Sequence, residues 1–269
     1  MNKLGLCLSG GGARGAYQIG VAKRLEELGV LAQVQAFAGT SIGAVNAAML
    51  ATQPVDKTYQ LWKAISPDEI KSTENIFKRL MQEKIHILDK GLYSIEALRN
   101  LLWEEIDYQE ILKKEVYVTL SEAGMVDESL FGLFKSGYRH YVKNDTQAVY
   151  SLLKNHTKED IVNLILASCS IPIIFPSVKI KNKQYYDGGV YDNTPVYPLI
   201  ESGCDTIIVI HLQLLDFIDK SKYPGINIIE IKHRGILGGM LNFDPAHSEI
   251  CYNLGYQDAC NFFEKNSLK

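Results

Sequence analysis

The sequence predicts an α/β fold built around a mostly parallel sheet. Two short apolar runs near the N-terminus, residues 4–8 and 34–38, are each followed by a glycine-containing turn and then by a helical pattern. Two further runs of the buried-strand type, residues 206–210 and 226–231, occur late in the chain. Such alternation of strands and helices is typical of parallel sheets whose strands are joined by right-handed crossovers.

The first helices are predicted from their periodicity and their ends. Residues 16–28 have apolar side chains at a helical period, and Gly29 ends that pattern. Residues 44–51 are rich in alanine and contain neither proline nor glycine, and Pro54 stops this second helix. Residues 55–114 are rich in helix formers and poor in strand signals, which predicts a helical insertion. This insertion can simply cover the sheet, or it can form the roof of a substrate cleft.

The second half of the chain continues with elements that are predicted from apolar runs, capping residues and turn residues. In order, these are a strand over 115–120, an apolar run over 130–135, a helix over 157–168, a proline-rich loop or edge over 171–176, a hairpin over 178–186, a helix over 194–203, the two late strands and a final helix over about 245–265. No repeat, low-complexity tract or linker divides the chain. A single domain over residues 1–269 is therefore the economical interpretation, with its motifs within about residues 4–200.

Composition and charge argue against several classes of protein. Hydrophobic residues make up 46% of the chain, and the net charge of −3 gives no basic excess that would favour nucleic acid as a partner. The five cysteines contain no C-x-x-C pair, so we expect buried free thiols in a reducing compartment and no metal site. No apolar run is long enough for a signal peptide or a membrane span. These features predict a cytoplasmic protein that can still make transient contact with a membrane surface.

A serine lies at a sharp turn between the second strand and the following helix. This turn, Gly39-Thr40-Ser41-Ile42-Gly43, has the G-x-S-x-G spacing, in which small residues let strand and helix pass closely while the serine is held in a strained, exposed position. Ser41 also stands at a helix N-terminus, where backbone N–H groups favour developing negative charge. An ordinary loop before an N-capped helix is the alternative, and the strand-turn-helix context favours a nucleophile.

A glycine-rich loop follows the first strand. Its sequence, residues 10–15, matches G-x-G-x-x-G, which by itself is the fingerprint of a dinucleotide site. That site needs an acidic residue at the end of the second strand, where this chain has the serine turn instead. No Lys-Ser or Lys-Thr pair follows the loop, as a phosphate-binding P-loop would require. What remains is a row of backbone N–H groups at a helix N-terminus, beside the serine turn on one edge of the sheet.

Backbone N–H groups that face a nucleophile are what an oxyanion hole requires. The candidate donors are Gly10, Gly11, Gly12 and Ala13, and Gly11 and Gly12 are favoured among them. Arg14 can either bind an acidic group or fix the loop, and the structural role is the favoured one.

An aspartate after the tyrosine-rich hairpin is the candidate base. Asp187-Gly188-Gly189 on its own is more typical of a simple turn. A serine hydroxyl is a weak nucleophile until an adjacent base accepts its proton, so the presence of Ser41 favours a catalytic role for Asp187.

These three motifs, in their type and their order, resemble those of the patatin-like phospholipase family. Residues 167–176 also resemble the segment before the family's aspartate, and Asn193 and Pro195 resemble the N-x-P that follows it. The resemblance covers about residues 4–200. Ser9 departs from it, because many members have Asp before the glycines, but the role implied for the loop belongs to backbone N–H groups.

The resemblance implies a three-layer α/β/α fold and a dyad of Ser41 and Asp187. Ser41 would attack an acyl-ester carbonyl with Asp187 as its base, and water would release the fatty acid from the acyl-enzyme. The implied substrates are phospholipids, lysophospholipids and neutral acyl esters, with no cofactor and no metal. The motif residues implied to support the site are Arg14, Gly15, Gly39, Gly43, Gly188, Gly189 and Asn193.

Two alternatives stay open at this point. A Ser-His-Asp hydrolase has the chain order serine, acid, histidine. His211, His233 and His247 lie beyond Asp187, and His211 is the best of them because it ends an apolar strand. A lone aspartate is a weak base with an ordinary pKa of about 3.9, although partial burial would raise it. The second alternative is a non-catalytic lipid-binding member of the fold, against which the complete set of motifs argues.

Overall fold

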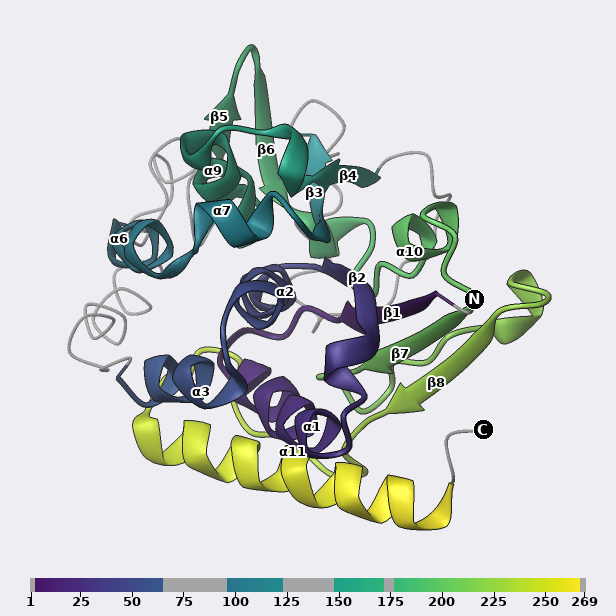
Figure 1. The fold of residues 1–269 in the computed structure, drawn as a ribbon. Helices are drawn as coiled ribbons and strands as arrows, with labels where there is room; N and C mark the ends of the chain where they lie inside the picture. Colours follow the sequence, from purple (N-terminus) through teal and green to yellow (C-terminus); the bar gives the residue numbers. More distant parts are fainter. Residues whose placement is uncertain (1–2, 65–95, 123–147, 172–176, 267–269) are drawn as a thin grey trace.

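A computed structural model contains the mostly parallel sheet that the sequence predicts (Figure 1), and it describes residues 3–64, 96–122, 148–171 and 177–266. The parallel strands are β1 (Leu4–Leu8), β2 (Val34–Gly39), β3 (Glu115–Glu122), β7 (Thr206–Ile210) and β8 (Asn227–Ile231). The antiparallel strands are β4 (Ala148–Leu152), β5 (Val178–Ile180) and β6 (Lys183–Asp187). The strand order is β5-β6-β3-β2-β1-β7-β8, and β4 pairs with β3.

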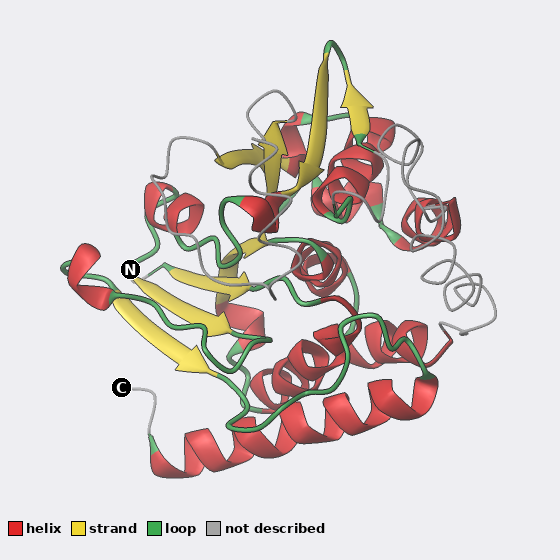
Figure 2. Cartoon of the chain, turned by 180° about the vertical axis from the view of Figure 1, so that it is seen from behind, coloured by secondary structure: helices red, strands yellow, loops and turns green. Residues whose placement is uncertain are grey.

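Helices cover both faces of this sheet and produce three layers (Figures 1 and 2). One face is covered by α1 (Ala16–Glu27), α2 (Ile42–Thr52), α3 (Val55–Ala64) and α11 (Pro245–Lys265), and the other by α10 (Tyr197–Glu201). Alternate residues of β1 show the two faces, because Leu6 and Leu8 join the larger core whereas Cys7 packs in a smaller core with Leu199. Beside β3, α9 (Lys158–Ser168) packs on the strand and α6 (Glu96–Glu105) packs on α9, while α7 (Tyr108–Ile111) contacts α2.

Several predicted elements have the limits expected from the sequence. The final helix occupies Pro245–Lys265, and the hairpin of β5 and β6 turns at residues 181–182. Thr157 caps α9 by accepting a hydrogen bond from the Asp160 N–H at 3.2 Å. The fold class predicted from strand and helix alternation is therefore confirmed.

Other predictions need correction or fall outside the described residues. The helix expected over 194–203 begins only at Tyr197, because the Thr194 N–H is held in a turn by the Asp192 carboxylate at 3.0 Å. β4 was not predicted, since its five residues are all half-buried and show no alternation of burial. The predictions for residues 65–95, 130–135 and 172–176 lie outside the described part of the chain.

The register of the sheet brings the carboxyl ends of neighbouring strands to one edge. Leu8 pairs with Gly39 on one side and with Ile210 on the other, and Ile210 pairs with Ile231. The glycine loop, the serine turn and the loops after β7 and β8 therefore lie side by side, where the arrows of the parallel strands end in Figure 2. β6 runs antiparallel to β3 and ends at the same edge with Asp187.

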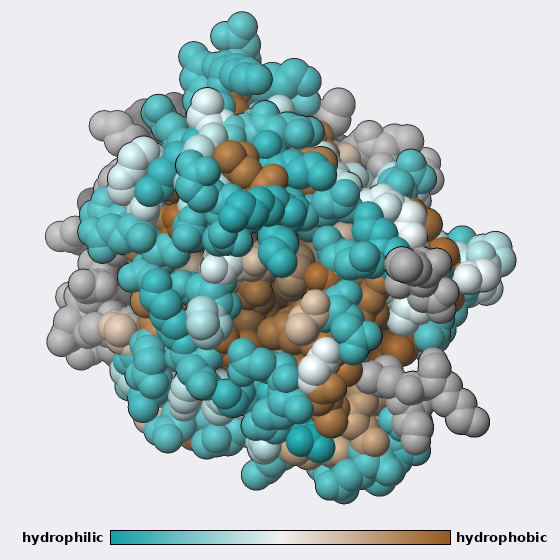
Figure 3. All heavy atoms as spheres, viewed as in Figure 1, coloured by the Kyte–Doolittle hydropathy of each residue, from teal (hydrophilic) through white to brown (hydrophobic). Residues whose placement is uncertain are grey.

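The outer surface differs in polarity from place to place. The face drawn in Figure 3 is mostly hydrophilic, with apolar side chains gathered in a hollow near its centre. The long helix α11 buries Cys251 and Ala259 against the core and leaves Ile250 exposed. Within the described residues, no helix combines the length and the apolar character needed to cross a bilayer.

Candidate active site

Ser41 occupies the turn between β2 and α2 in a strained conformation. Its φ is 55° and its ψ is −128°, and in the described part of the chain only Lys181 is another non-glycine residue with positive φ. Gly39 and Gly43 permit this turn: a Cβ atom at Gly39 would collide with the Gly43 carbonyl oxygen, and one at Gly43 with the Leu8 carbonyl oxygen. Such backbone strain costs about 1–3 kcal/mol and is typical of functional sites.

The serine turn is buried, which corrects the expectation that Ser41 is exposed. Ser41 is only 6% exposed, because Gly10 approaches its Cβ atom closely and Ser168 covers its backbone. The Ser41 N–H donates to the Ser168 hydroxyl at 2.9 Å, and that hydroxyl donates to the Thr119 carbonyl at 2.8 Å. The Ser41 N–H is therefore not free to bind an oxyanion. Sequence reasoning missed this role of Ser168, although the residue lies in the 167–176 segment that resembles the family.

Asp187 lies at the end of β6 beside the Ser41 side chain and is 2% exposed. Its Oδ1 atom accepts a hydrogen bond from the Gly189 N–H at 2.8 Å, whereas its buried Oδ2 atom has no hydrogen-bond partner among the described residues. Burial raises the pKa of Asp187 to about 7, and the interactions with the Ser41 side chain and the Gly189 N–H oppose that rise. A carboxylate whose pKa is near neutrality is a better proton acceptor than an ordinary aspartate.

The glycine loop leaves two N–H groups available to a ligand. Gly10 donates to the Asn193 carbonyl oxygen at 3.1 Å, and Ala13 donates to a carbonyl oxygen of the loop after β8 at 2.8 Å. These bonds correct the prediction that Gly10 and Ala13 are oxyanion donors, because their N–H groups already have acceptors within the fold. The N–H groups of Gly11 and Gly12 have no acceptor in the part of the chain that the structure describes.

Comparison with protein families tests the resemblance that the motifs suggested. The sequence profile described as patatin-like phospholipase matches residues 6–200, which contain the glycine loop, the serine turn and Asp187. The chain belongs to the patatin-like phospholipase family. The family predicted from the order of the three motifs is therefore confirmed.

The relatives of this patatin-like chain are longer proteins. Lysophospholipase NTE1 of Candida glabrata is 25% identical over 274 residues, which cover 97% of this chain and 14% of that protein. The 1-acylglycerol-3-phosphate O-acyltransferase Pnpla3 of Mus musculus is 20% identical, over 98% of this chain and 59% of that protein. Among solved structures, human GIVD cytosolic phospholipase A2 has a TM-score of 0.52 at 10% identity, over 98% of this chain and 61% of that one, and this likeness supports the fold. The chain thus spans less than two thirds of each of these proteins.

The side chains of Asn193 and Arg14 fix the position of the glycine loop in this patatin-like protein. The Asn193 amide donates to the Gly10 carbonyl oxygen at 3.4 Å and to Oδ2 of the buried Asp216 at 3.2 Å. Asn193 was identified from its N-x-P motif, but Asp216 was missed because it lies in the loop after β7, outside every motif. Arg14 donates from Nε to the Gly238 carbonyl oxygen at 2.8 Å, which agrees with the structural role favoured for it.

The remaining motif glycines of the patatin-like pattern lie where backbone and side chains approach closely. A Cβ atom at Gly15 would lie 2.6 Å from the ring of Trp62, and one at Gly188 would collide with the Thr119 carbonyl oxygen. Gly189 supplies the N–H that Asp187 accepts. These positions shape the site without presenting a side chain to it.

The histidines that follow Asp187 are paired with other side chains. His211, the best candidate from the sequence, donates from Nε2 to the Glu230 carboxylate at 2.9 Å. In the described residues, no hydrogen bond joins a histidine to Ser41 or Asp187. This arrangement favours the patatin-type dyad over a Ser-His-Asp triad. The other two pairs are His233 with Asp258 and His247 with Cys251.

Proposed function

We propose that this protein is a serine hydrolase that cleaves the acyl esters of lipids. The observation that carries the proposal is the placement of the strained Ser41 beside a buried Asp187 whose pKa is raised to about 7. The family, and the lysophospholipase name of several relatives, support a lipid ester as the substrate. Phospholipids, lysophospholipids and neutral acyl esters are the candidate substrates.

In the proposed reaction, the Ser41 hydroxyl attacks the ester carbonyl carbon while the Asp187 carboxylate accepts its proton. The carbonyl oxygen becomes an oxyanion, which the N–H groups of Gly11 and Gly12 would stabilise. The alcohol leaves with the proton that Asp187 holds. A water molecule then attacks the acyl-enzyme with Asp187 again as the proton acceptor, which releases the fatty acid and restores Ser41.

The proposal includes the surroundings in which such an enzyme meets its substrate. Lipid esters are held in membranes and micelles, so we propose that the protein makes transient contact with a lipid surface. The cytoplasmic location predicted from the sequence belongs to the same proposal. A non-catalytic lipid-binding protein is the alternative, and the labelling experiment below separates the two.

An alkyl fluorophosphonate is expected to label the protein once, on Ser41, because only a serine with an adjacent base reacts readily with this reagent. Intact mass and peptide mapping report the label, while hydrolysis of p-nitrophenyl butyrate and lysophosphatidylcholine is followed in parallel. Activity should fall in proportion to labelling, and protein unfolded before treatment should not react. Labelling at a different serine, or full hydrolysis after complete labelling, would contradict the proposal. Lipid binding with neither labelling nor hydrolysis would support the non-catalytic alternative.

Gly11→Ala is expected to lower kcat by about 10²-fold, the usual scale for one lost oxyanion donor, with a smaller effect on KM. A Cβ atom at Gly11 would lie 2.6 Å from the Leu212 Cβ, so the loop must shift and its N–H groups must move. Gly29→Ala is the control, because a Cβ atom at Gly29 meets nothing within 4 Å and the residue lies outside the loop. A raised KM with unchanged kcat in Gly11→Ala would make the loop a substrate-binding element instead.

A further inference from the structure

The C-terminal end of α9 is bonded to both residues of the proposed dyad. This α9 end, residues 168–170, is buried, and Ser168 and Ser170 are 0% exposed. The Ser41 N–H donates to the Ser168 hydroxyl at 2.9 Å, and the Asp187 N–H donates to the Ser170 carbonyl oxygen at 2.9 Å. Two residues that are far apart in sequence are therefore attached to one short stretch of backbone.

The Ser168 hydroxyl is itself fixed, because it donates to the Thr119 carbonyl oxygen on β3 at 2.8 Å. The next residue of that strand, Leu120, pairs with Asp187 on β6. A Cβ atom at Gly188 would lie 2.3 Å from the Thr119 carbonyl oxygen, so the chain directly after Asp187 packs on the same group. The Ser168 hydroxyl thus connects the Ser41 backbone to the strand that also places Asp187.

The α9 end is held in place by its own helix. The Ser170 N–H donates to the Ala167 carbonyl oxygen at 3.0 Å, and the Ser170 hydroxyl donates to the Leu166 carbonyl oxygen at 2.8 Å. These bonds satisfy carbonyl groups that the last turn of a helix otherwise leaves free. Leu166 and Ala167 are themselves buried in the larger core. The two groups that accept the Ser41 and Asp187 N–H bonds therefore belong to an anchored helix end.

Ser41 needs such support because its φ of 55° is unfavourable for a residue with a Cβ atom. A strained backbone conformation persists only where the surrounding structure holds it. The bonds from the Gly43 N–H to the Thr40 carbonyl and from the Ala44 N–H to the Ser41 carbonyl stay within the turn. The bond to Ser168, in contrast, holds the Ser41 backbone from outside the turn.

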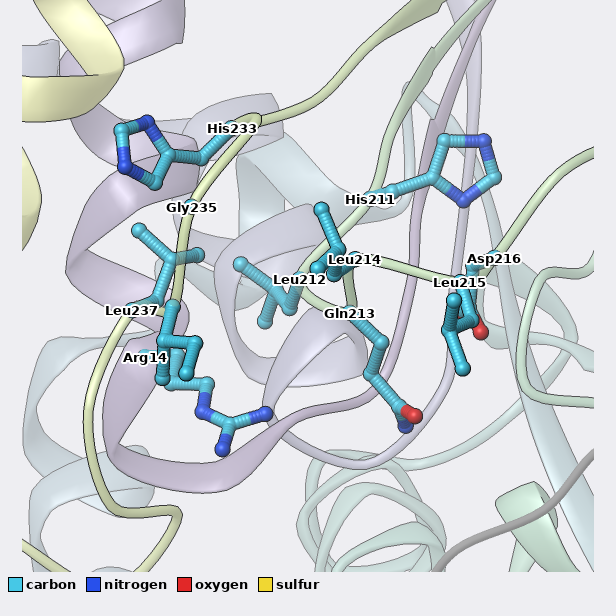
Figure 4. A pocket seen from close by; sticks show the side chains of 11 residues that line it. Arg14, His211, Leu212, Gln213, Leu214, Leu215, Asp216, His233, Gly235 and Leu237 are labelled. Carbon is cyan, nitrogen blue, oxygen red and sulfur yellow. The ribbon is translucent and has the colours of Figure 1, made fainter.

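Open space for a ligand adjoins the glycine loop, whereas the α9 end is closed. A cavity of about 510 Å³ lies beside that loop (Figure 4), and it is lined by Arg14 and by residues of the loops after β7 and β8. None of the residues 168–170 is among the described residues that line it. Because Ser168 is 0% exposed, a substrate has no surface of this residue to touch. Ser168 can therefore act on the reaction only through Ser41.

We propose that Ser168 is a positioning residue whose hydroxyl holds the Ser41 backbone so that the Ser41 side chain lies beside Asp187. This proposal rests on the proposed ester hydrolysis by Ser41 and Asp187. A hydroxyl group suits the position, because it accepts one hydrogen bond and donates another at a buried place where either partner would otherwise be unsatisfied. Ser168 transfers no proton and forms no bond to the substrate.

The test is the kcat of Ser168→Ala for p-nitrophenyl butyrate, expressed per site that a fluorophosphonate labels at completion, so that unfolded protein is not counted. The variant should lose about 10- to 100-fold in kcat with KM nearly unchanged, because the nucleophile is misplaced while no substrate contact is lost. The rate of labelling should fall by a similar factor. Thr58→Val is the matched control and should keep the wild-type kcat. Thr58 is also buried, and its hydroxyl also connects a donor, the Gln53 amide, to an acceptor, the Pro54 carbonyl, but it lies on α3.

Ser168→Cys is the second variant, and it decides the question if Ser168→Ala does not fold. A thiol is a weak donor and a weak acceptor of similar size, so kcat should fall several-fold, to a value between those of the wild type and Ser168→Ala. Wild-type kcat in either folded Ser168 variant would overturn the proposal. So would an equal loss in Thr58→Val, because removal of any buried hydroxyl would then explain the effect. A raised KM with unchanged kcat would also overturn it, because the α9 end would then act on substrate binding.

Comparison with Ser41→Ala separates this proposal from the proposed function. If hydrolysis by the wild type does not depend on Ser41, the proposed function fails and the positioning role fails with it. If hydrolysis depends on Ser41 but is unchanged in Ser168→Ala, the positioning role alone fails.

Discussion

Ser41→Ala is expected to lower kcat for every ester by about 10⁴-fold or more. The variant lacks the nucleophile but keeps the backbone N–H that donates to Ser168, so the turn between β2 and α2 should persist. The measurement is kcat for p-nitrophenyl butyrate and for lysophosphatidylcholine, with circular dichroism as the check on folding. Residual turnover at more than a few per cent in the folded variant would show that another group is the nucleophile.

Ser41→Gly is the informative partner of that variant, because it separates catalysis from strain. Both substitutions remove the hydroxyl and should be equally inactive. Glycine adopts a φ of 55° and a ψ of −128° without the clash that a Cβ atom causes. The free energy of unfolding of Ser41→Gly should therefore exceed that of Ser41→Ala by about 1 kcal/mol or more, as urea denaturation would measure. Equal stability of the two variants would mean that the turn is not strained.

The motifs could be predicted from the sequence because each depends on neighbours close in the chain. Gly39 and Gly43 stand within two residues of Ser41. Position 39 requires glycine because a Cβ atom there would collide with the Gly43 carbonyl oxygen, which belongs to the same turn. The buried parallel strands also have a strong local signal, as the run Thr206–Ile210 illustrates. β4 has no such signal, because its half-buried residues are positioned by contacts with other elements, chiefly the pairing with β3.

The partners of the site residues could not be predicted, because they come from distant parts of the chain. The Ser168 hydroxyl that takes the Ser41 N–H lies 127 residues away in sequence. The Gly10 and Ala13 N–H groups donate to the carbonyl oxygens of Asn193 and Met240, which are far from the glycine loop in sequence, so only the fold reveals that these donors are used. The amount by which the pKa of Asp187 rises likewise depends on burial by the whole fold.

Asp187→Asn is expected to abolish turnover while the fold is preserved. Asparagine has nearly the same volume, and its side-chain oxygen can still accept the Gly189 N–H, but it cannot take a proton from Ser41. The expected loss in kcat is on the order of 10⁴-fold. The measurement is kcat for p-nitrophenyl butyrate, together with the rate of fluorophosphonate labelling, which should fall as well.

The raised pKa of Asp187 gives the wild type two pH dependences that Asp187→Asn should lack. Asp187 must be ionised to accept the proton, so kcat/KM should rise as the pH passes through about 7 and level off above it. Stability should change in the opposite direction, because the folded state holds this proton at pH values where the unfolded state, with a pKa of about 3.9, has lost it. The free energy of unfolding of the wild type should therefore fall between about pH 4 and pH 7, and the variant should show a smaller decrease over that interval.

The matched comparison for Asp187→Asn is His211→Ala, which decides between a dyad and a triad. His211 is a buried histidine with an acidic partner at the same edge of the sheet, yet its partner is Glu230 and not Asp187. His211→Ala should therefore retain most of the wild-type kcat, and the same is expected of His233→Ala and His247→Ala. If His211→Ala were folded and as inactive as Asp187→Asn, the enzyme would use a Ser-His-Asp triad. That result would contradict the proposed dyad of Ser41 and Asp187.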